Sequence, residues 1–237
     1  ATALCAHILI DRGKLDLDAK VSLYWPEFAQ NGKENVTVRM LLDHSAGVPV
    51  LRAPLPDKAV CDWDLMCGRL AAEAPFWQPG LRHGYHALTM GWTVGEVVRR
   101  VSGKSLGRFF QDEVERPLGL DFWIGTPESV EPRISPISQL PLSKDLPLTP
   151  LAEMALADRA SIPALFLFNG GGFSPNSRAC HAAEIGAANG VTNGRGLAGM
   201  YAPLANGGGK LVRPETVARM GQVAMASHLD ETLRVPT

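Results

Sequence analysis

The sequence predicts a fold made mainly of helices, and three stretches support that prediction. Residues 1–10 are apolar nearly all the way round a helix, as expected of a buried one. Residues 94–101 place valines at i, i+3, i+4 and i+7, and residues 106–114 place Leu, Phe, Phe and Val at i, i+3, i+4 and i+8, the same helical pattern. Gly103 ends the first of these two helices and Ser105 caps the second, so they form a helical hairpin. With 237 residues, the chain suffices for one large domain or two small ones.

Shorter elements are expected along the rest of the chain. The opening helix should stop at Gly13, and residues 14–21 alternate as a short extended connector would. Helices are predicted at 38–44, 63–74, 151–159, 193–204 and 214–220, with Thr192 or Asn193 as the cap of the fourth. Within it, Pro203 predicts a kink or an early end.

Residues 125–178 are rich in proline, with one plausible helix at 151–159. So long a stretch with little regular structure is more often an active-site wall than a passive connector.

Composition excludes several classes of function. The net charge of −1 and the pI near 6.7 give no electrostatic basis for binding nucleic acid or an anionic membrane. No apolar run reaches the roughly 18 residues of a spanning helix, and the first residues lack the basic region of a signal peptide. The four cysteines form no C-x-x-C pair. They predict buried thiols in a reducing compartment, hence a cytoplasmic protein, with a Cys61–Cys67 disulfide as the alternative.

The chain is organised around residues 75–87, which lie between two helical patterns and deliver Tyr85 to the foot of the following helix. Pro79 and Gly80 make a turn pair, because proline presets φ and glycine accepts the positive φ of a type II turn. A phenol fixed there can reach a reacting group. The alternative is a half-buried tyrosine with a satisfied hydroxyl.

Other chemistry finds little support in the sequence. A metal site would pair His83 and His86 with His181 and Glu184, but that spacing fits no zinc signature, so no metal is expected. The two Asn-Gly-Gly-Gly tracts lack the Lys and Ser or Thr of a phosphate loop. There is no G-x-S-x-G nucleophile elbow, so the usual serine hydrolase motif is absent.

The order of motifs is more specific than any one of them. Asp-Arg-Gly at 11–13 is followed by Leu-Asp-Leu-Asp at 15–18, Val-Arg-Met-Leu-Leu-Asp-His-Ser-Ala-Gly at 38–47 and Phe-Trp-Gln-Pro-Gly at 76–80. Tyr85 and the hairpin, which closes with Pro-Leu-Gly-Leu at 117–120, come next. This series resembles the serine β-lactamase and penicillin-binding-protein superfamily, and most closely its class C-like esterase branch. The resemblance covers about 1–125 and returns at 181–209.

The resemblance implies an α/β (α+β) fold of the β-lactamase type. Residues 1–237 would be a single domain, mainly its helical subdomain at about 20–205, with an incomplete antiparallel sheet. It also implies a serine and lysine spaced S-x-x-K at the start of the buried helix, a tyrosine matched by Tyr85, and a later K-T-G or H-x-G strand. A serine hydroxyl needs a nearby base to be nucleophilic, and a lysine and a phenol held close share a proton. Backbone N–H groups stabilise the oxyanion of the acyl-enzyme mechanism.

Three departures qualify the resemblance. No serine in the chain is followed three residues later by lysine, so the nucleophile is expected about five residues upstream of residue 1. Neither later motif occurs, and the chain is therefore expected to be truncated at both ends. Ala87 stands where lactamases carry the asparagine that holds the lactam amide, which favours esters.

These observations predict a serine hydrolase of small carboxylic esters, with no cofactor. Tyr85 is the proton shuttle, and His86 and Ala87 are the substrate-binding residues. The partner is a small-molecule ester, not a nucleic acid; the oligomeric state is left open. Ser45 is expected to cap a helix end rather than to catalyse, and Trp77 and Trp92 to pack. The alternatives are a non-catalytic binding module of the same fold, and a peptidase or β-lactamase that cleaves amides.

Overall fold

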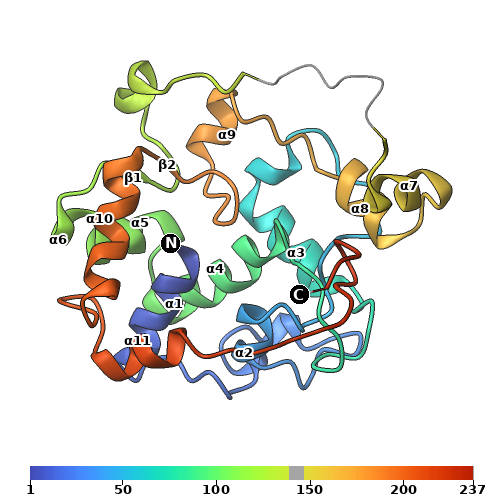
Figure 1. The fold of residues 1–237 in the computed structure, drawn as a ribbon, viewed down its shortest axis with the longest axis horizontal. Coiled ribbons are helices and arrows are strands. Elements are labelled where there is room, and N and C mark those ends of the chain that lie inside the picture. Colours follow the sequence, from blue (N-terminus) through green and yellow to red (C-terminus); the bar gives the residue numbers. More distant parts are fainter. Residues whose placement is uncertain (139–146, 237) are drawn as a thin grey trace.

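The structure is a computed structural model that describes residues 1–138 and 147–236, and it opens with a buried helix. This helix, α1 (Thr2–Asp11), buries seven of its ten residues and packs against α4, α5 and α11 (Figure 1). The chain turns away after the last turn of α1 at Gly13, whose φ of 67° is a left-handed conformation that favours glycine. The buried opening helix and its glycine end are thus confirmed.

The predicted hairpin is also present. It consists of α4 (Thr89–Ser102), α5 (Leu106–Phe110), a π-helical turn (Gln111–Glu115) and α6 (Arg116–Leu118). Gly103 ends α4 at φ 70°, and the Ser105 side chain accepts a hydrogen bond from the Arg108 backbone N–H. Glu96, on the side of α4 away from the valines, is 1% exposed and is held by two arginines of α4 and by Trp63 Nε1.

The N-terminal half also contains two shorter α-helices, α2 (Val38–Leu42) and α3 (Trp63–Ala72), and 3-10 turns at Val21–Leu23, Pro26–Phe28 and Ala59–Cys61. The helix predicted at 38–44 stops at Leu42, because His44 has φ 63° and cannot continue it. The predicted extended connector at 14–21 is mostly irregular. Of these residues, Lys20 alone forms a bridge, with Thr37.

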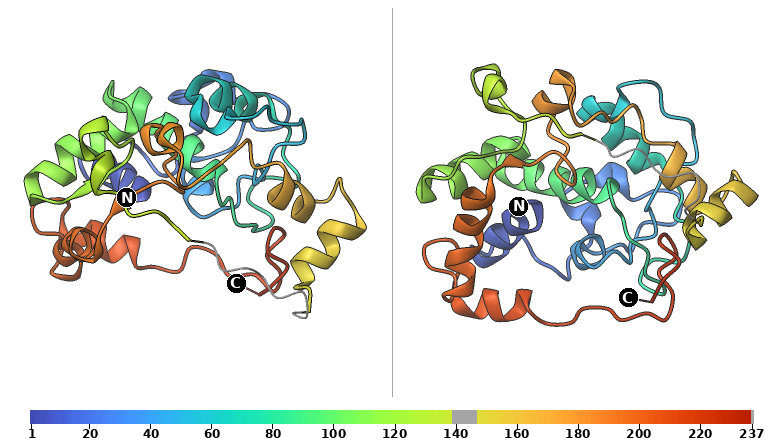
Figure 2. Two further views of the ribbon diagram at one scale, coloured as in Figure 1. Left: turned by 90° about the horizontal axis from the view of Figure 1, so that it is seen from above. Right: turned by 45° about the horizontal axis from the view of Figure 1, so that its top comes forward.

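The prediction of a single helix within 125–178 was wrong. Besides α7 (Pro150–Ala157), this segment contains a 3-10 helix (Glu128–Arg133), α8 (Ile162–Phe168) and the start of α9 (Arg178–Ala182). The reason is that Pro150 and Pro163 occupy first turns, where a missing N–H costs nothing, and Ser161 caps α8. Both views of Figure 2 show α7 and α8 at the periphery. Residues 139–146 of this segment lie outside the described ranges.

One pair of strands joins the hairpin to the C-terminal helices. The strands β1 (Phe122–Trp123) and β2 (Val191–Thr192) are antiparallel, and Phe122 lies opposite Thr192. They are followed by α10 (Gly194–Ala205), capped by Asn193 with Pro203 in its last turn, and by α11 (Pro214–Met220). The predicted fold class, mainly helical with a small antiparallel sheet, is confirmed. Within the described ranges, no helix is both long and apolar enough to cross a membrane.

Candidate active site

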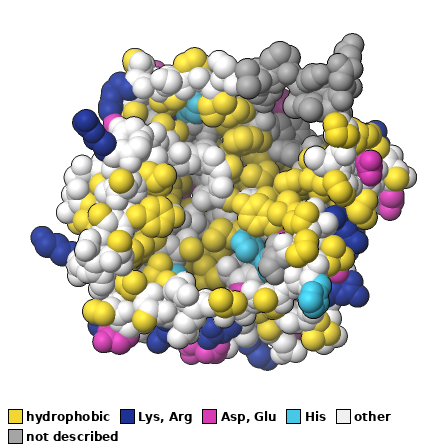
Figure 3. Space-filling model, viewed as in Figure 1, with side chains coloured by type: hydrophobic (Ala, Val, Ile, Leu, Met, Phe, Trp, Pro, Cys, Tyr) yellow, Lys and Arg dark blue, Asp and Glu magenta, His cyan; other side chains and the backbone are white. Residues whose placement is uncertain are grey.

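The predicted site residues meet at one cavity of about 220 Å³. Its lining comes from the N-terminal end of α1, the loop after α2, the loop before α4, the start of α4 and the segment before β2. The lining residues are Ala1, Thr2, Ala3, His44, Tyr85, His86, Ala87, Met90, Gly186 and Ala187. Figure 3, in the orientation of Figure 1, shows a hollow near the middle of the molecule with many hydrophobic side chains around it.

The segment before β2 lies close to both α1 and α4 at this cavity. Thr2 Oγ1 in α1 donates a hydrogen bond of 2.6 Å to the carbonyl oxygen of Gly186. A side chain at Gly91 would put its Cβ only 2.5 Å from the backbone nitrogen of Ala187. Glycine is therefore required at position 91 for the segment before β2 to lie against α4.

Tyr85 enters the cavity from the predicted turn, where Gly80 has φ 85°. Its side chain is 40% exposed, and its ring lies edge-on to the His44 ring at 5.2 Å between centroids. The Tyr85 backbone N–H donates to the carboxylate of Asp230, at 3.0 Å to Oδ2. The backbone of this residue is thus fixed where the residue lines the cavity.

Asp230 is the anchor of this arrangement, and its residue is fully buried. Besides Tyr85, its Oδ1 accepts hydrogen bonds from the backbone N–H groups of Thr232, at 2.8 Å, and Leu233, at 2.7 Å. His83 Nδ1 lies 3.2 Å from Oδ2. The C-terminal segment, which crosses the molecule after α11, therefore holds the tyrosine loop in place (Figure 1).

Sequence reasoning missed Asp230. It is 145 positions from Tyr85 and belongs to no recognised motif. Its carboxylate accepts hydrogen bonds from the N–H groups two and three positions later. From sequence alone, such an Asp is typical of a turn and gives no indication of a functional site.

His86 is buried between two backbone groups. Its Nδ1 lies 2.6 Å from the carbonyl oxygen of Gly84, and its Nε2 accepts a 3.0 Å hydrogen bond from the Val48 N–H. This pattern fixes the neutral tautomer with the proton on Nδ1. Burial, and then the neighbouring His44, lower the pKa of His86 to about 3. Both ring nitrogens are engaged, although the residue lines the cavity, so its role in substrate binding stays a prediction.

His44 completes the network. Its Nδ1 accepts a 3.2 Å hydrogen bond from the His86 backbone N–H, which leaves the ring proton on Nε2. Burial lowers the pKa of His44, and the nearby His83 lowers it further. The site thus has two neutral imidazoles beside Tyr85 near pH 7.

Of the remaining residues that the sequence singled out, one lines the cavity and the others make structural contacts. Ala87 lines the cavity, and its substrate contact stays a prediction. Ser45 is 1% exposed and donates from Oγ to Asp43 Oδ1 at 2.6 Å, as expected of a structural helix end. Trp92 is buried, and Trp77 packs edge-on against His86 and donates from Nε1 to the Ser45 carbonyl oxygen.

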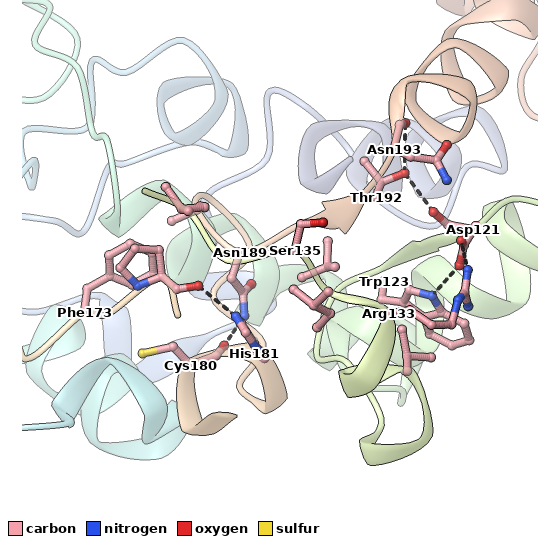
Figure 4. A pocket seen from close by; sticks show the side chains of 17 residues that line it. Asp121, Trp123, Arg133, Ser135, Phe173, Cys180, His181, Asn189, Thr192 and Asn193 are labelled. Atoms are coloured by element: carbon pink, nitrogen blue, oxygen red, sulfur yellow. Dashed lines mark hydrogen bonds and ion pairs between the residues drawn. The ribbon is translucent and has the colours of Figure 1, made fainter. Parts of the chain in front are cut away.

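The segment 125–178 does not contribute its described residues to the Tyr85 cavity. It borders a second cavity of about 390 Å³, between α9, β2 and the 3-10 helix (Figure 4). There Arg133 pairs with Asp121, and His181 lies between Glu131 and the carbonyl oxygen of Pro175.

No three His, Cys, Asp or Glu side chains in 1–138 and 147–236 are grouped to hold a metal ion. Of the four residues of the hypothetical metal site, His181 has the partners just described. Glu184 instead accepts hydrogen bonds at the start of α5.

Comparison with known proteins decides the family. The sequence profile of the family described as Beta-lactamase matches residues 1–232. The chain belongs to the β-lactamase family. This confirms the predicted superfamily and its esterase branch.

Individual members of the β-lactamase family agree with this assignment. The chain is 36% identical over 213 residues to the esterase/beta-lactamase LipL of Mycobacterium tuberculosis, an alignment that covers 87% of this chain and 49% of LipL. A crystal structure of a family VIII carboxylesterase superposes with a TM-score of 0.83 at 37% identity, over 99% of this chain and 62% of that one. A penicillin-binding protein homologue from Caulobacter crescentus gives 0.84 at 31% identity, over 100% and 61%. The chain thus spans about half the length of LipL.

Proposed function

We propose that this chain is part of a serine hydrolase that cleaves small carboxylic esters through an acyl-enzyme, with Tyr85 as the proton shuttle. The observation that carries the proposal is the position of Tyr85. Tyr85, whose backbone is anchored by Asp230, lines the same cavity as the N-terminal end of the buried helix α1. In the family the reactive serine and lysine are expected at the start of that helix.

The proposed reaction uses the cavity as follows. With the proton that the lysine and Tyr85 share held by the lysine, Tyr85 Oη is a phenolate oxygen. The serine Oγ then attacks the ester carbonyl carbon while its proton passes to Oη, and the same proton passes from Oη to the departing alcohol oxygen. Water attacks the acyl-enzyme in the second half of the cycle, with the same proton route reversed. The chain contains no Ser-x-x-Lys. The proposal therefore requires the nucleophile to come from sequence outside these 237 residues.

Esters are favoured over amides by two observations. The first is that Ala87 lines the cavity and has no hydrogen-bonding side chain with which to hold an amide substrate. The second is that one relative is named a carboxylesterase; LipL, named an esterase/beta-lactamase, is named for both kinds of bond.

The test is to expose the full-length protein to a fluorophosphonate and to map the labelled peptide by mass spectrometry. We expect a single adduct, on the serine of a Ser-x-x-Lys motif in the segment before residue 1. Hydrolysis of p-nitrophenyl acetate, and none of a chromogenic β-lactam, would then assign the substrate class. Folded protein without an adduct would instead indicate the non-catalytic binding module.

A matched pair of variants tests Tyr85 itself. Y85F removes the hydroxyl at the cavity, whereas Y201F removes a hydroxyl from α10, where Tyr201 is 56% exposed. Ester hydrolysis should fall in Y85F alone; equal activity of the two variants would contradict the assigned shuttle.

A further inference from the structure

Two cysteines that are far apart in the sequence lie side by side. Cys61 ends the 3-10 turn Ala59–Cys61, and Cys180 lies in α9 (Arg178–Ala182). Their sulfur atoms are 3.7 Å apart, although 119 positions separate the residues. A disulfide needs the two sulfurs at about 2.05 Å, so the two side chains must move closer for the bond to form.

The surroundings distinguish this pair from the other thiols. Cys61 is half-buried, so a reagent can reach it from solvent, whereas Cys180 is 2% exposed and its Sγ accepts from the Ser174 N–H. Cys5 is fully buried within α1, and Cys67 Sγ lies 3.7 Å from Glu96 Oε2. The alternative Cys61–Cys67 bond is thus not the arrangement that the structure presents.

We propose that Cys61 and Cys180 are a modification site at which a small-molecule disulfide oxidant forms an intramolecular disulfide. The Cys61 thiolate attacks one sulfur of the oxidant, which forms a mixed disulfide and releases one oxidant thiol. The Cys180 thiolate then attacks Cys61 Sγ and releases the second thiol. Two electrons and two protons pass from the protein to the oxidant, which is fully reduced. This site does not depend on the proposed ester hydrolysis.

The bond would connect two parts of the fold that otherwise only pack together. Asn189 Nδ2 donates to the carbonyl oxygen of Cys180 at 2.7 Å, so α9 is coupled to the segment that continues into the Tyr85 cavity wall and β2. The side chain of Cys180 also borders the second cavity (Figure 4). Oxidation would therefore tie the Ala59–Cys61 turn to α9 and restrict the segment 186–193, which lines first the Tyr85 cavity and then the second cavity.

The rate of the reaction has a predictable pH dependence. Burial, and then the hydrogen bond with Cys180, raise the pKa of Cys61 to about 11. Because the thiolate is the nucleophile, oxidation should accelerate about tenfold for each pH unit between neutrality and pH 9.

The experiment is to incubate the folded, reduced full-length protein with oxidised glutathione, block free thiols with N-ethylmaleimide, and map peptides without reduction. We expect a link between the peptides of Cys61 and Cys180, with Cys5 and Cys67 alkylated only after unfolding. The melting temperature should rise by roughly 5 °C or more, because the bond closes a long loop. C61S and C180S should each abolish the link, and C67S should keep it.

Other outcomes would overturn the inference. A stable glutathione adduct on Cys61 with no link to Cys180 would show that the sulfurs do not meet in solution. A link from Cys61 to Cys67, or a link that forms only in denaturant, would do the same. The wild-type peptide map decides the question even if a serine variant folds poorly.

Discussion

Two regions of this molecule surround their side chains very differently. The Tyr85 corner, comprising residues 44–48, 83–87 and 230–234, holds its polar groups by buried hydrogen bonds to the backbone. The outer segment, residues 125–178, exposes large apolar side chains on short helices. Among these, Leu156 is 50% exposed and Phe168 is 57% exposed.

The difference shows which region fixes the positions of its side chains most strictly. A buried polar group without its partner costs free energy, so each contact in the Tyr85 corner restricts the others. The helices of the outer segment are held by local caps and first-turn prolines, and changes there should be tolerated. The predictions below test this contrast from the largest expected effect to the smallest.

The hydroxyl of Tyr85 should matter for turnover and not for folding. In Y85F the rate of ester hydrolysis should fall by about 10²- to 10⁴-fold, the usual contribution of a positioned proton-transfer group. The melting temperature should stay within about 2 °C of the wild type, because no hydrogen bond inside the described protein is lost. Steady-state kinetics and thermal unfolding on the full-length protein measure both. A large loss of stability would mean that Tyr85 is structural.

Removal of the Asp230 carboxylate should affect both properties. D230A leaves the buried N–H groups of Tyr85, Thr232 and Leu233 without an acceptor, and should cost about 2–4 kcal/mol of unfolding free energy. Because the Tyr85 backbone is released, kcat should fall about tenfold or more with a smaller change in KM.

An exposed carboxylate gives the matched control for Asp230. Asp18 is paired with Arg39 at the surface, and D18N should leave both stability and kcat unchanged. If D230A behaved like D18N, the anchor role would be disproved.

The two neutral histidines should make stability fall in mild acid. The folded pKa of His86, about 3, lies below its unfolded value of about 6.5, so the unfolded chain takes up the proton first. Stability is then complete above about pH 6.5 and declines as the pH falls toward 3, by about 1.4 kcal/mol per pH unit. Urea unfolding between about pH 7.5 and pH 5 should show a loss of roughly 2 kcal/mol from His86.

The lowered pKa of His44 adds to this slope in the same direction. The variant H86N should flatten the profile over that range. An unchanged slope in H86N would assign the pH dependence to other groups.

The smallest expected effect is the loss of stability when an exposed phenylalanine of the outer segment is removed, and a core phenylalanine gives the comparison. Phe168 stacks on Arg159 at the surface, and F168A should cost about 0.5 kcal/mol. Phe110 is 1% exposed in the core, and F110A should cost about 3–5 kcal/mol. Chemical denaturation of the two variants compares them directly. Equal costs would show that the outer segment is packed as tightly as the core.

The outcome of the sequence predictions follows the range of the interactions involved. Gly13, Gly80 and Gly103 end or turn the chain where expected, and Ser105 and Asn193 cap helices, because each signal acts on backbone groups within a few residues. The helix α8 was missed since prolines were interpreted as breaks, although Pro163 is suited to a first turn. The helix α9 was missed although Ser177 caps it, because it is only five residues long.

The sequence by itself determined the helical hairpin, the buried first helix and the family. The tertiary structure alone decided that Asp230 anchors that loop, that His86 is neutral and enclosed, and that Cys61 faces Cys180. The physical reason is that burial and hydrogen bonding between distant segments depend on how the whole chain packs. A local pattern fixes which backbone conformations are favourable, but it contains no information about which remote group will lie beside a side chain.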